Sequence, residues 1–406
     1  MGKRILFLTP QLPYPPQQGT AIRNLNLIAQ VARRHEVHLL SFRAAHRQGS
    51  DLGPLQGLCA SLDTVSMPSR GKLRRLWTTL ASPDPDMHHR LSSTLFDKKL
   101  ESVLNAARPD VVEVEGLEMA QYGLRAKQLA ADDAPLLVYD AHNAEYLLQQ
   151  RIFESDSRQP RRWLGAFYSL IQWRKLRRYE AAVCHRAERV IACSRADADA
   201  LTRLVPALKP IVVPNGVDTQ YYQPGIVSPA PLGAEALVFT GKMDFRPNVD
   251  AVLWFCSKVL PAVQEASPGA HFYIVGRDPH PRLMPLANMP GVTVTGFVDD
   301  PRPYIAAAAV YVVPLLTGGG TRLKVLEAMA MGKALLSTTL GCEGIHATPG
   351  RDVALADRAD DFAAQVLALL KDDAQREQLG RAARAFVERH FGWPMVTRSL
   401  EQAYER

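Results

Sequence analysis

With 406 residues, 47% of them apolar and 22% charged, the chain has the composition of an ordinary globular protein and is long enough for two or three domains. Its five scattered cysteines show no metal-ligand spacing, which favours a reduced, cytosolic compartment, and its apolar runs are too short for a signal peptide or a membrane-spanning helix. The net charge of +7 arises in residues 1–200, which hold 28 Lys and Arg against 21 Asp and Glu.

Short apolar strands alternate with helical segments through the first half of the chain. "RILFLT" predicts a buried strand at 4–9, and "AIRNLNLIAQVARR" predicts a helix after a Pro/Gly-rich loop. Further strands are expected at "EVHLLSF", "DVVEVE", "LLVYDAH" and "RVIACS". Such alternation indicates βαβ units and a parallel sheet.

The pattern restarts after a turn-rich break near residues 205–235. Strands are expected at "LVFTG", "HFYIVG", "VTVTG", "VYVVPLL" and "ALLSTT", with one long helix at 248–266 and two or three helices at the C-terminus. We therefore expect an α/β protein of two Rossmann-like domains that face each other across a cleft, at 1–205 and 206–385, with a helix at 386–406 that returns to the first domain.

The break contains the turn "VVPNGVD". Asn215 and Gly216 suit positive φ, and Asp218 is placed to cap the chain as it enters the linker. Upstream, Ser194 is expected to N-cap the helix "RADADALTRL". Both features are sufficiently explained as structural.

The stretch "TGGGTRLKVLEAMAMG" at 317–332 follows the strand "VYVVPLL" and begins a helix. Its glycines allow the backbone to approach a ligand, and the helix N-terminus, Arg322 and Lys324 supply positive charge for a diphosphate. Glu327 lies on the same helical face and can accept hydrogen bonds from sugar hydroxyls. These properties suit a nucleotide-sugar; the alternative is a glycine-rich turn before a solvated Lys324–Glu327 pair.

Together with "VVPNGVD", "VIACS", "VFTGKMDFRPN", "YIVG" and "VTGFVDD", this stretch resembles the GT-B-fold glycosyltransferases of family 4, and the resemblance covers nearly the whole chain. Within the family the chain most resembles the bacterial exopolysaccharide sugar transferases associated with exosortase (PEP-CTERM) systems. The resemblance implies a retaining enzyme that moves a hexose from a nucleoside-diphosphate sugar to a saccharide or lipid-linked saccharide acceptor. It implies no metal and no cofactor, and no Asp-X-Asp motif occurs in a suitable strand-end loop.

The resemblance also implies a donor site in the second domain. The family often has two glutamates flanking seven residues; Glu327 fits the second, whereas the first falls on Gly319, so backbone N–H groups would hold the sugar hydroxyls. Lys242 stands where relatives have arginine, and "FRPN" offers Arg246 or Asn248 in place of a lysine. The expected donor-binding residues are Gly19, Gly241, Arg246, Gly276, Phe297, Val298, Gly319, Gly320 and Thr321; for Phe297 the alternative is core packing.

In the first domain, Gly19 is expected near the donor phosphate, although Gln18 departs from the family's glycine pair. His142 matches a histidine that faces the donor sugar in relatives, with a structural role as the alternative. It is not expected to bind metal, since no second His or Cys shares its spacing. The expected catalytic residues are His142, Lys242, Arg322, Lys324 and Glu327. The acceptor-side candidates are Arg23, Asn24, Glu115, Asp140 and Asn143. For Glu115 the alternative is a solvated carboxylate in a loop.

The excess positive charge concentrates at Arg70–Trp77 and Arg161–Glu180. Aromatics among arginines between Arg161 and Arg178 suit a helix at an anionic membrane surface, so the expected location is the cytoplasm, peripheral to the inner face of the cell membrane. The alternative packs these aromatics into the core. Nucleic acid is disfavoured as a partner because no recognised module accompanies the charge.

Three other functions remain open at this stage. A membrane or nucleic-acid adaptor that uses the basic first half is disfavoured, because it leaves the motifs of the second domain unexplained. A GT-B nucleotide-sugar epimerase would be expected to carry further acid/base carboxylates in the first domain. A non-catalytic nucleotide-sugar binding protein would bind donor without turnover, and the departure at Gly319 is compatible with it.

Overall fold

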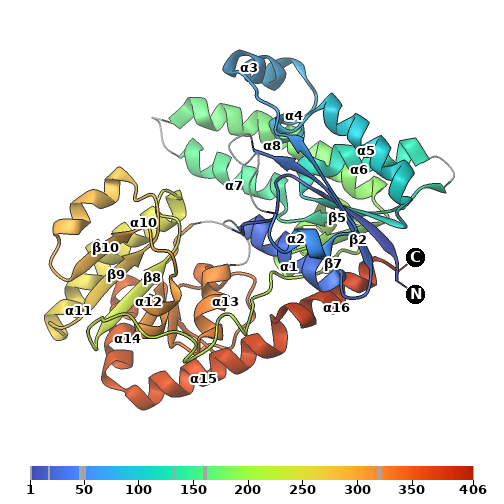
Figure 1. The fold of residues 1–406 in the computed structure, drawn as a ribbon. Helices are drawn as coiled ribbons and strands as arrows, with labels where there is room; N and C mark the ends of the chain where they lie inside the picture. The colour runs from blue at the N-terminus through green and yellow to red at the C-terminus, as the bar shows by residue number, and fades with distance from the viewer. Residues whose placement is uncertain are drawn as a thin grey trace. The chain divides into compact units, whose positions relative to one another are not determined.

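The computed structural model describes residues 2–16, 19–44, 52–130, 133–158, 162–317 and 322–405 (Figure 1). It consists of two compact units: Met1–Pro214 with Val396–Arg406, and Asn215–Met395. The sequence analysis placed the first boundary at residue 205 and the start of the returning segment at 386, whereas the units divide after Pro214 and again before Val396.

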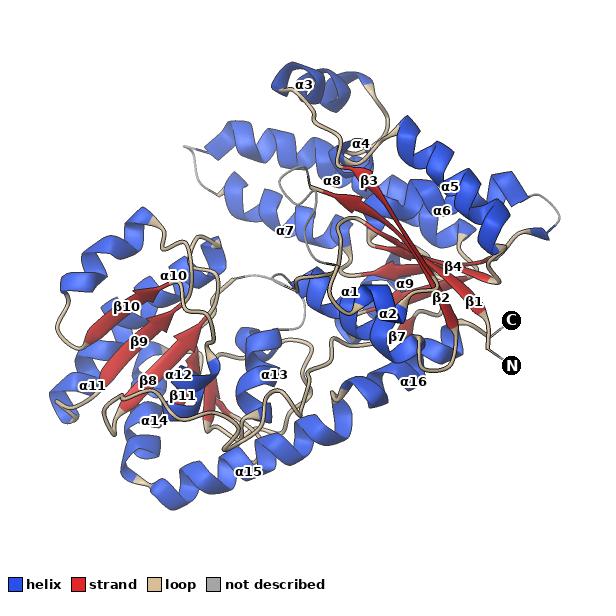
Figure 2. Ribbon diagram, in the orientation of Figure 1, coloured by secondary structure: helices blue, strands red, loops and turns tan. Residues whose placement is uncertain are grey.

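The first unit is built on a seven-stranded parallel sheet in the order β3-β2-β1-β4-β5-β6-β7 (Figure 2). Its strands are β1 Arg4–Thr9, β2 Glu36–Arg43, β3 Ser61–Ser66, β4 Val111–Glu115, β5 Leu136–Ala141, β6 Arg189–Ala192 and β7 Ile211–Val212. The predicted parallel sheet is therefore confirmed, with two additions that were not expected from the sequence: the edge strands β3 and β7.

Helices cover both faces of this sheet. Because β1 is therefore buried on both sides, its sequence is an almost continuous apolar run. They are α1 Gly19–Val31, α2 Leu55–Leu58, α3 Lys72–Ala81, α4 Asp86–Arg90, α5 Thr94–Ala107, α6 Ala120–Ala130, α7 Glu145–Ser157, α8 Trp163–Arg186, α9 Arg195–Leu204 and α16 Trp393–Ala403, with a short 3₁₀ turn at Leu117–Met119. Ser194 caps α9 as expected, accepting a hydrogen bond from the Asp197 amide at 3.1 Å.

The second unit contains a six-stranded parallel sheet in the order β10-β9-β8-β11-β12-β13. Its strands are β8 Ala236–Thr240, β9 His271–Val275, β10 Val292–Gly296, β11 Val310–Val313, β12 Leu335–Ser337 and β13 Ala354–Leu355. Its helices are α10 Arg246–Trp254, α11 Leu260–Ala266, α12 Arg302–Ala307, α13 Leu323–Ala330, α14 Ala359–Lys371 and α15 Asp373–His390, with 3₁₀ turns at Pro281–Asn288 and Leu340–Cys342.

The long helix expected at 248–266 is continuous but irregular. A π-helical turn at Phe255–Val259 separates α10 from α11. Pro261 lies in the first turn of α11 and has no N–H to donate, so the ordinary hydrogen-bond ladder cannot pass through it.

The turn "VVPNGVD" needs its glycine for a different reason from the one expected. Neither Asn215 nor Gly216 has positive φ, so that expectation was wrong. A Cβ on Gly216 would instead lie 2.6 Å from the indole of Trp393, so glycine is required by packing. Asp218 does cap the following turn, accepting from the Gln220 and Tyr221 amides at 2.9 Å.

Within the described part of the chain, no helix combines the length and the apolar character that a bilayer span requires.

Candidate functional site

Two glycines bring the carboxyl ends of β8 and β9 into close backbone contact. Gly241 and Gly276 follow these strands and have φ values of +156° and +154°. A Cβ on Gly276 would lie 1.7 Å from the Gly241 carbonyl oxygen, and the Gly241 amide donates to Val275 O at 3.0 Å. Larger residues are therefore excluded at both positions, and the strand ends present bare backbone.

The ammonium group of Lys324 lies against this backbone. Its Nζ donates to Asn248 Oδ1 at 2.9 Å and lies 3.9 Å from the centre of the Phe239 ring. A Cβ on Gly241 would lie only 2.7 Å from the same Nζ. Lys324 comes from α13 and Asn248 from α10, so two helices and one strand end place this cation.

Burial lowers the pKa of Lys324 to about 7, with the positive charge of Arg322 acting in the same direction and Glu327 opposing it. Within the described residues Lys324 forms no ion pair. An anion that arrived beside it would favour the charged ammonium and raise its pKa. A lysine held in this way can respond to a phosphate group more strongly than one already paired with a carboxylate.

Glu327 lies one turn further along α13 and is hydrogen-bonded to Tyr222. Burial raises the pKa of Glu327, while Tyr222 and Lys324 act in the opposite direction. The side chain is therefore not the freely solvated partner of Lys324 that the alternative interpretation required. Arg322 is the N-cap residue of α13. The predicted Gly319, Gly320 and Thr321, like Gln18, lie outside the described residues.

The remaining donor-site candidates occupy the neighbouring strand ends at the surface. Lys242 pairs with Asp244 at 2.9 Å, and Arg246 approaches Asp250 at 3.5 Å. Phe297 follows β10 and is 69% exposed, so the alternative of core packing was wrong for this residue. Its neighbour Val298 is half-buried and packs against the core of the unit.

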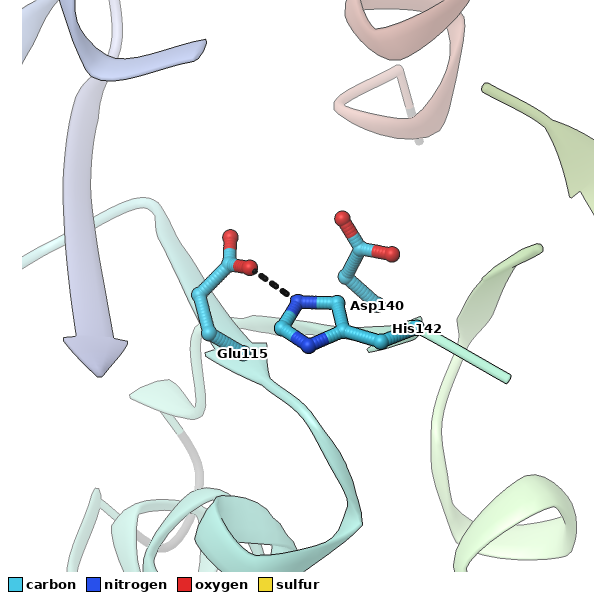
Figure 3. A group of neighbouring side chains, drawn as sticks. All are labelled: Glu115, Asp140 and His142. Atoms are coloured by element: carbon cyan, nitrogen blue, oxygen red, sulfur yellow. Dashed lines mark hydrogen bonds and ion pairs between the residues drawn. The ribbon is translucent and has the colours of Figure 1, made fainter. Parts of the chain in front are cut away.

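The first unit carries a different cluster at the carboxyl ends of β4 and β5. His142 Nε2 lies 2.8 Å from Glu115 Oε2, and Figure 3 shows these two side chains beside Asp140. The His142 ring is 16% exposed, whereas Glu115 is fully buried. Burial opposes the charge on His142, but the bond to Glu115 and the nearby Asp140 carboxylate raise its pKa above the ordinary value.

Asp140 is held by a buried arginine. Arg23 Nη2 lies 2.7 Å and its Nε 3.0 Å from Asp140 Oδ2, and its Nη1 donates to Val213 O at 3.0 Å and Pro214 O at 3.2 Å. With its amide nitrogen facing the acceptors, Asn24 donates to Glu115 Oε2 at 2.8 Å. Arg23 and Asn24 of α1 therefore fix the positions of Asp140 and Glu115 in the cluster.

A third carboxylate, that of Glu113, belongs to this cluster and is hydrogen-bonded to a residue far away in the sequence. Glu113 lies two residues before Glu115 on the same face of β4, and the Tyr404 hydroxyl donates to it. Burial, followed by the charges of Glu115 and Asp140, raises the pKa of Glu113 well above its ordinary value. No local pattern around Tyr404 could have indicated this partnership, because the two residues lie 291 positions apart.

Several of these residues were expected from the sequence to lie on the acceptor side. Arg23, Asn24, Glu115 and Asp140 are at most 2% exposed and are bonded to one another or to His142. Their contact with an acceptor stays a prediction, whereas the alternative of a solvated Glu115 was wrong because this side chain is fully buried. Asn143 donates to Glu145 Oε1 at 3.2 Å, and Gly19 is the exposed first residue of α1.

Glu115, Asp140 and His142 also form a group with ligand atoms within 4.8 Å of one another. The spacing argument against a metal at His142 considered only a second His or Cys, and so it left out Asp140, two residues before the histidine, and Glu115, at the end of β4. Arg23 already neutralises Asp140, and His142 and Asn24 bond to Glu115. The absence of a metal therefore stays a prediction, and its support is that both carboxylates already have partners within the protein.

Comparison with known protein families gives two matches that divide the chain much as the two units do. Residues 18–221 match the model described as Glycosyltransferase Family 4, and residues 234–372 match Glycosyl transferases group 1.

The curated relatives are distant. A phosphatidyl-myo-inositol mannosyltransferase from Mycolicibacterium smegmatis is 30% identical over 48% of this chain and 51% of its own length. The glycogen synthase of Mycobacterium tuberculosis is 24% identical over 71% of this chain and 73% of its own. The chain thus spans about half the length of the first of these relatives.

Solved structures share the fold over nearly their full length. Sucrose-phosphate synthase from Thermosynechococcus elongatus superimposes with a TM-score of 0.71 at 18% identity, covering 99% of this chain and 98% of its own. HepE from Anabaena, solved with UDP and glucose, gives a TM-score of 0.65 at 15% identity and covers 98% of each chain. The two parallel-sheet units have the GT-B architecture, and the chain belongs to glycosyltransferase family 4.

Proposed function

We propose that the protein is a retaining, metal-independent hexosyltransferase that transfers sugar from a nucleoside-diphosphate sugar to a saccharide or lipid-linked saccharide acceptor in exopolysaccharide synthesis. The family membership supports transfer from a nucleotide-sugar. The observation that carries the proposal is the Lys324 ammonium, which lies against Gly241 and Asn248 at the carboxyl end of β8.

In this proposal the second unit binds the donor. Lys324 and Arg322 neutralise the diphosphate as it leaves, which is electrostatic stabilisation of the transition state by groups already in place. Lys242 can add a third cation once it leaves Asp244, because both members of that pair are close to half exposed. Glu327 accepts hydrogen bonds from hydroxyls of the donor, and Phe297 stacks on the base.

His142 acts in the transfer step and not in diphosphate binding. Its imidazole is fixed by Glu115 on one side, while part of the ring remains exposed. The raised pKa favours an imidazolium, which can donate a hydrogen bond to a sugar oxygen. The retaining reaction then needs no protein nucleophile: the family resemblance implies attack from the face of the leaving group, with the donor phosphate accepting the acceptor proton.

A nucleotide-sugar epimerase remains the second candidate because the first unit does contain further buried carboxylates. Glu113, Glu115 and Asp140 have no solvent exposure. Each nevertheless has a partner within the protein, which favours a structural role. An epimerase that removes and returns a proton on carbon would exchange that hydrogen with deuterated solvent when no acceptor is present, whereas a transferase would not.

The test is a thermal-shift panel of UDP-, GDP- and ADP-sugars. Stabilisation by one nucleotide series identifies the base, since a ligand that binds only the folded state raises its stability. We expect Arg322→Ala and Lys324→Ala to lose the shift, and His142→Ala to keep it while losing transfer. Unchanged shifts in both cation variants would refute the diphosphate assignment; full binding without transfer to any saccharide would support a binding protein.

A further inference from the structure

Helix α3 turns its apolar side away from the protein. Leu73, Trp77 and Leu80 fall on one helical face and are 85%, 69% and 67% exposed. Thr78 and Thr79 are instead buried. A surface helix of a globular protein normally has the reverse arrangement, with its apolar stripe on the core, so this face requires a partner outside the unit.

Polar contacts hold α3 in this orientation. Lys175 of α8 donates to the carbonyl oxygens of Thr79 at 2.7 Å and Ser82 at 2.5 Å, at the C-terminal end of α3. Before its first turn, Arg70 pairs with Asp86 of α4. The helix lies at the outer edge of the first unit beside α4 (Figure 1). Its outward apolar face is therefore set by bonds at both ends and is not a loose arrangement.

The start of α8 extends the same apolar area. Its first turns expose three large side chains, Trp163, Leu164 and Phe167, each by more than half. Arg75 of α3 donates to the Tyr168 hydroxyl at 3.0 Å, which joins the two helices. We define the α3–α8 surface by its six exposed apolar residues, Leu73, Trp77, Leu80, Trp163, Leu164 and Phe167.

The charge around this surface is mostly positive. Residues 64–83 contain four Lys and Arg, residues 157–179 contain seven, and neither segment contains Asp or Glu. Two neighbouring carboxylates oppose part of this charge: Asp86 pairs with Arg70 and lies 3.4 Å from Arg75, and Asp156 pairs with Arg162. Exposed tryptophan and leucine beside an excess of cations match a bilayer interface with anionic headgroups, where apolar side chains enter the lipid and cations meet phosphate.

We propose that the α3–α8 surface docks on an anionic lipid bilayer. The proposal corrects the location expected from sequence, which assigned membrane contact to the whole of Arg161–Arg178. Trp173 in that stretch is partly buried and stacks on Phe153 with ring centres 6.0 Å apart, so this part of α8 packs on its own unit. The membrane surface consists instead of the beginning of α8 together with α3.

Vesicle flotation tests this surface in the full-length protein. We expect binding to vesicles of equal parts phosphatidylglycerol and phosphatidylcholine, weakening as salt is raised, and no binding to phosphatidylcholine alone. Leu73→Gln/Trp77→Gln should lower the partition coefficient by about tenfold or more, since both side chains leave the lipid. The matched control is Leu95→Gln/Met284→Gln, which removes two other side chains of 64% and 58% exposure and should bind as the unmodified protein does.

A second readout uses the tryptophan fluorescence of the protein itself. Lipids carrying a bromine quencher in the acyl chain should quench this fluorescence in the unmodified protein, and Trp77→Gln should remove part of that quenching. Equal flotation of the α3 variant and the control, or no quenching by anionic vesicles, would overturn the proposal. So would a concentration-dependent dimer that the α3 variant abolishes, because a second copy would then cover the surface. Donor binding is independent of all these outcomes, so this proposal and the proposed function can fail separately.

Discussion

Each unit holds a cation near the ends of its strands, but the two cations have different partners. Both units place polar side chains at the carboxyl ends of parallel strands, where ligands of open α/β sheets are found. In the first unit, the buried cation Arg23 is paired with Asp140 at 2.7 Å and bonded to two carbonyl oxygens. In the second, the partly buried Lys324 has a neutral amide and an aromatic ring as its close neighbours.

This difference separates a structural cation from one that is available to a ligand. An arginine whose donors already bond within the protein has few donors left for a substrate. The charge of Asp140 keeps the pKa of Arg23 raised, although burial acts in the opposite direction. A lysine with its pKa lowered to about 7 gains stabilisation when a phosphate approaches. The chemistry of binding is therefore expected in the second unit, while the first presents only His142 from its cluster.

The largest expected effect is on stability and concerns the structural pair. Asp140→Ala leaves Arg23 buried without its carboxylate and should lower the free energy of unfolding by about 3–5 kcal/mol. Urea unfolding followed by circular dichroism measures it. Lys324→Met, which removes the partly buried cation of the second unit, should cost far less or stabilise the protein, since Lys324 forms no ion pair within the described residues.

The matched control for Asp140→Ala is Glu377→Ala. Glu377 pairs with Arg381 on α15 at 3.2 Å, and both side chains are 72% exposed, so its removal should cost less than about 1 kcal/mol. If the two variants unfolded at the same urea concentration, Arg23 would not depend on Asp140, and the contrast between the two clusters would be lost.

A smaller effect is expected at the rim of the donor site. Phe297→Ala should weaken binding of the preferred nucleotide-sugar by about 1–3 kcal/mol if the exposed ring stacks on the base. Isothermal titration gives this value, and the melting temperature without ligand should not move because the ring is 69% exposed. A comparable loss for Phe245→Ala, at an exposed ring beside α10, would show that the effect is not specific to Phe297.

The fold could be predicted from sequence wherever strands are buried on both faces. The runs "RILFLT" and "LVFTG" became the inner strands β1 and β8, because strands that are covered by helices on both faces consist mostly of apolar residues. The strand β3 was missed because "SLDTVS" lies at an edge, where polar residues are tolerated. The two-residue β13, at the edge of the second sheet, was missed for its brevity.

The site was predicted less completely, for a physical reason. Sequence reasoning identified Lys324 and His142 because each follows a strand in a recognisable motif. It could not show that Asn248, 76 positions away, would fix the lysine, or that Tyr404 would hold Glu113. Burial is also invisible in the sequence: Arg23 in α1 and Asp140 at the end of β5 resemble acceptor-binding residues, but in the structure they are buried and paired with each other.

Proton uptake on donor binding tests the central claim most directly. Above pH 7 the free protein holds Lys324 largely neutral, because burial lowers the pKa of this lysine to about 7. A bound diphosphate raises that pKa, so binding must take up a proton, and affinity must fall as pH rises from about 7. The diphosphate of a nucleotide-sugar does not titrate in this range, and Arg322 stays charged.

The measurement is isothermal titration of the nucleotide-sugar near pH 8 in two buffers of different ionisation enthalpy. The account predicts uptake approaching one proton in the unmodified protein, and none in Lys324→Met, which should also bind more weakly at pH 7. Equal heats in both buffers for the unmodified protein, or the same uptake in the methionine variant, would contradict the assignment of Lys324 to the donor diphosphate.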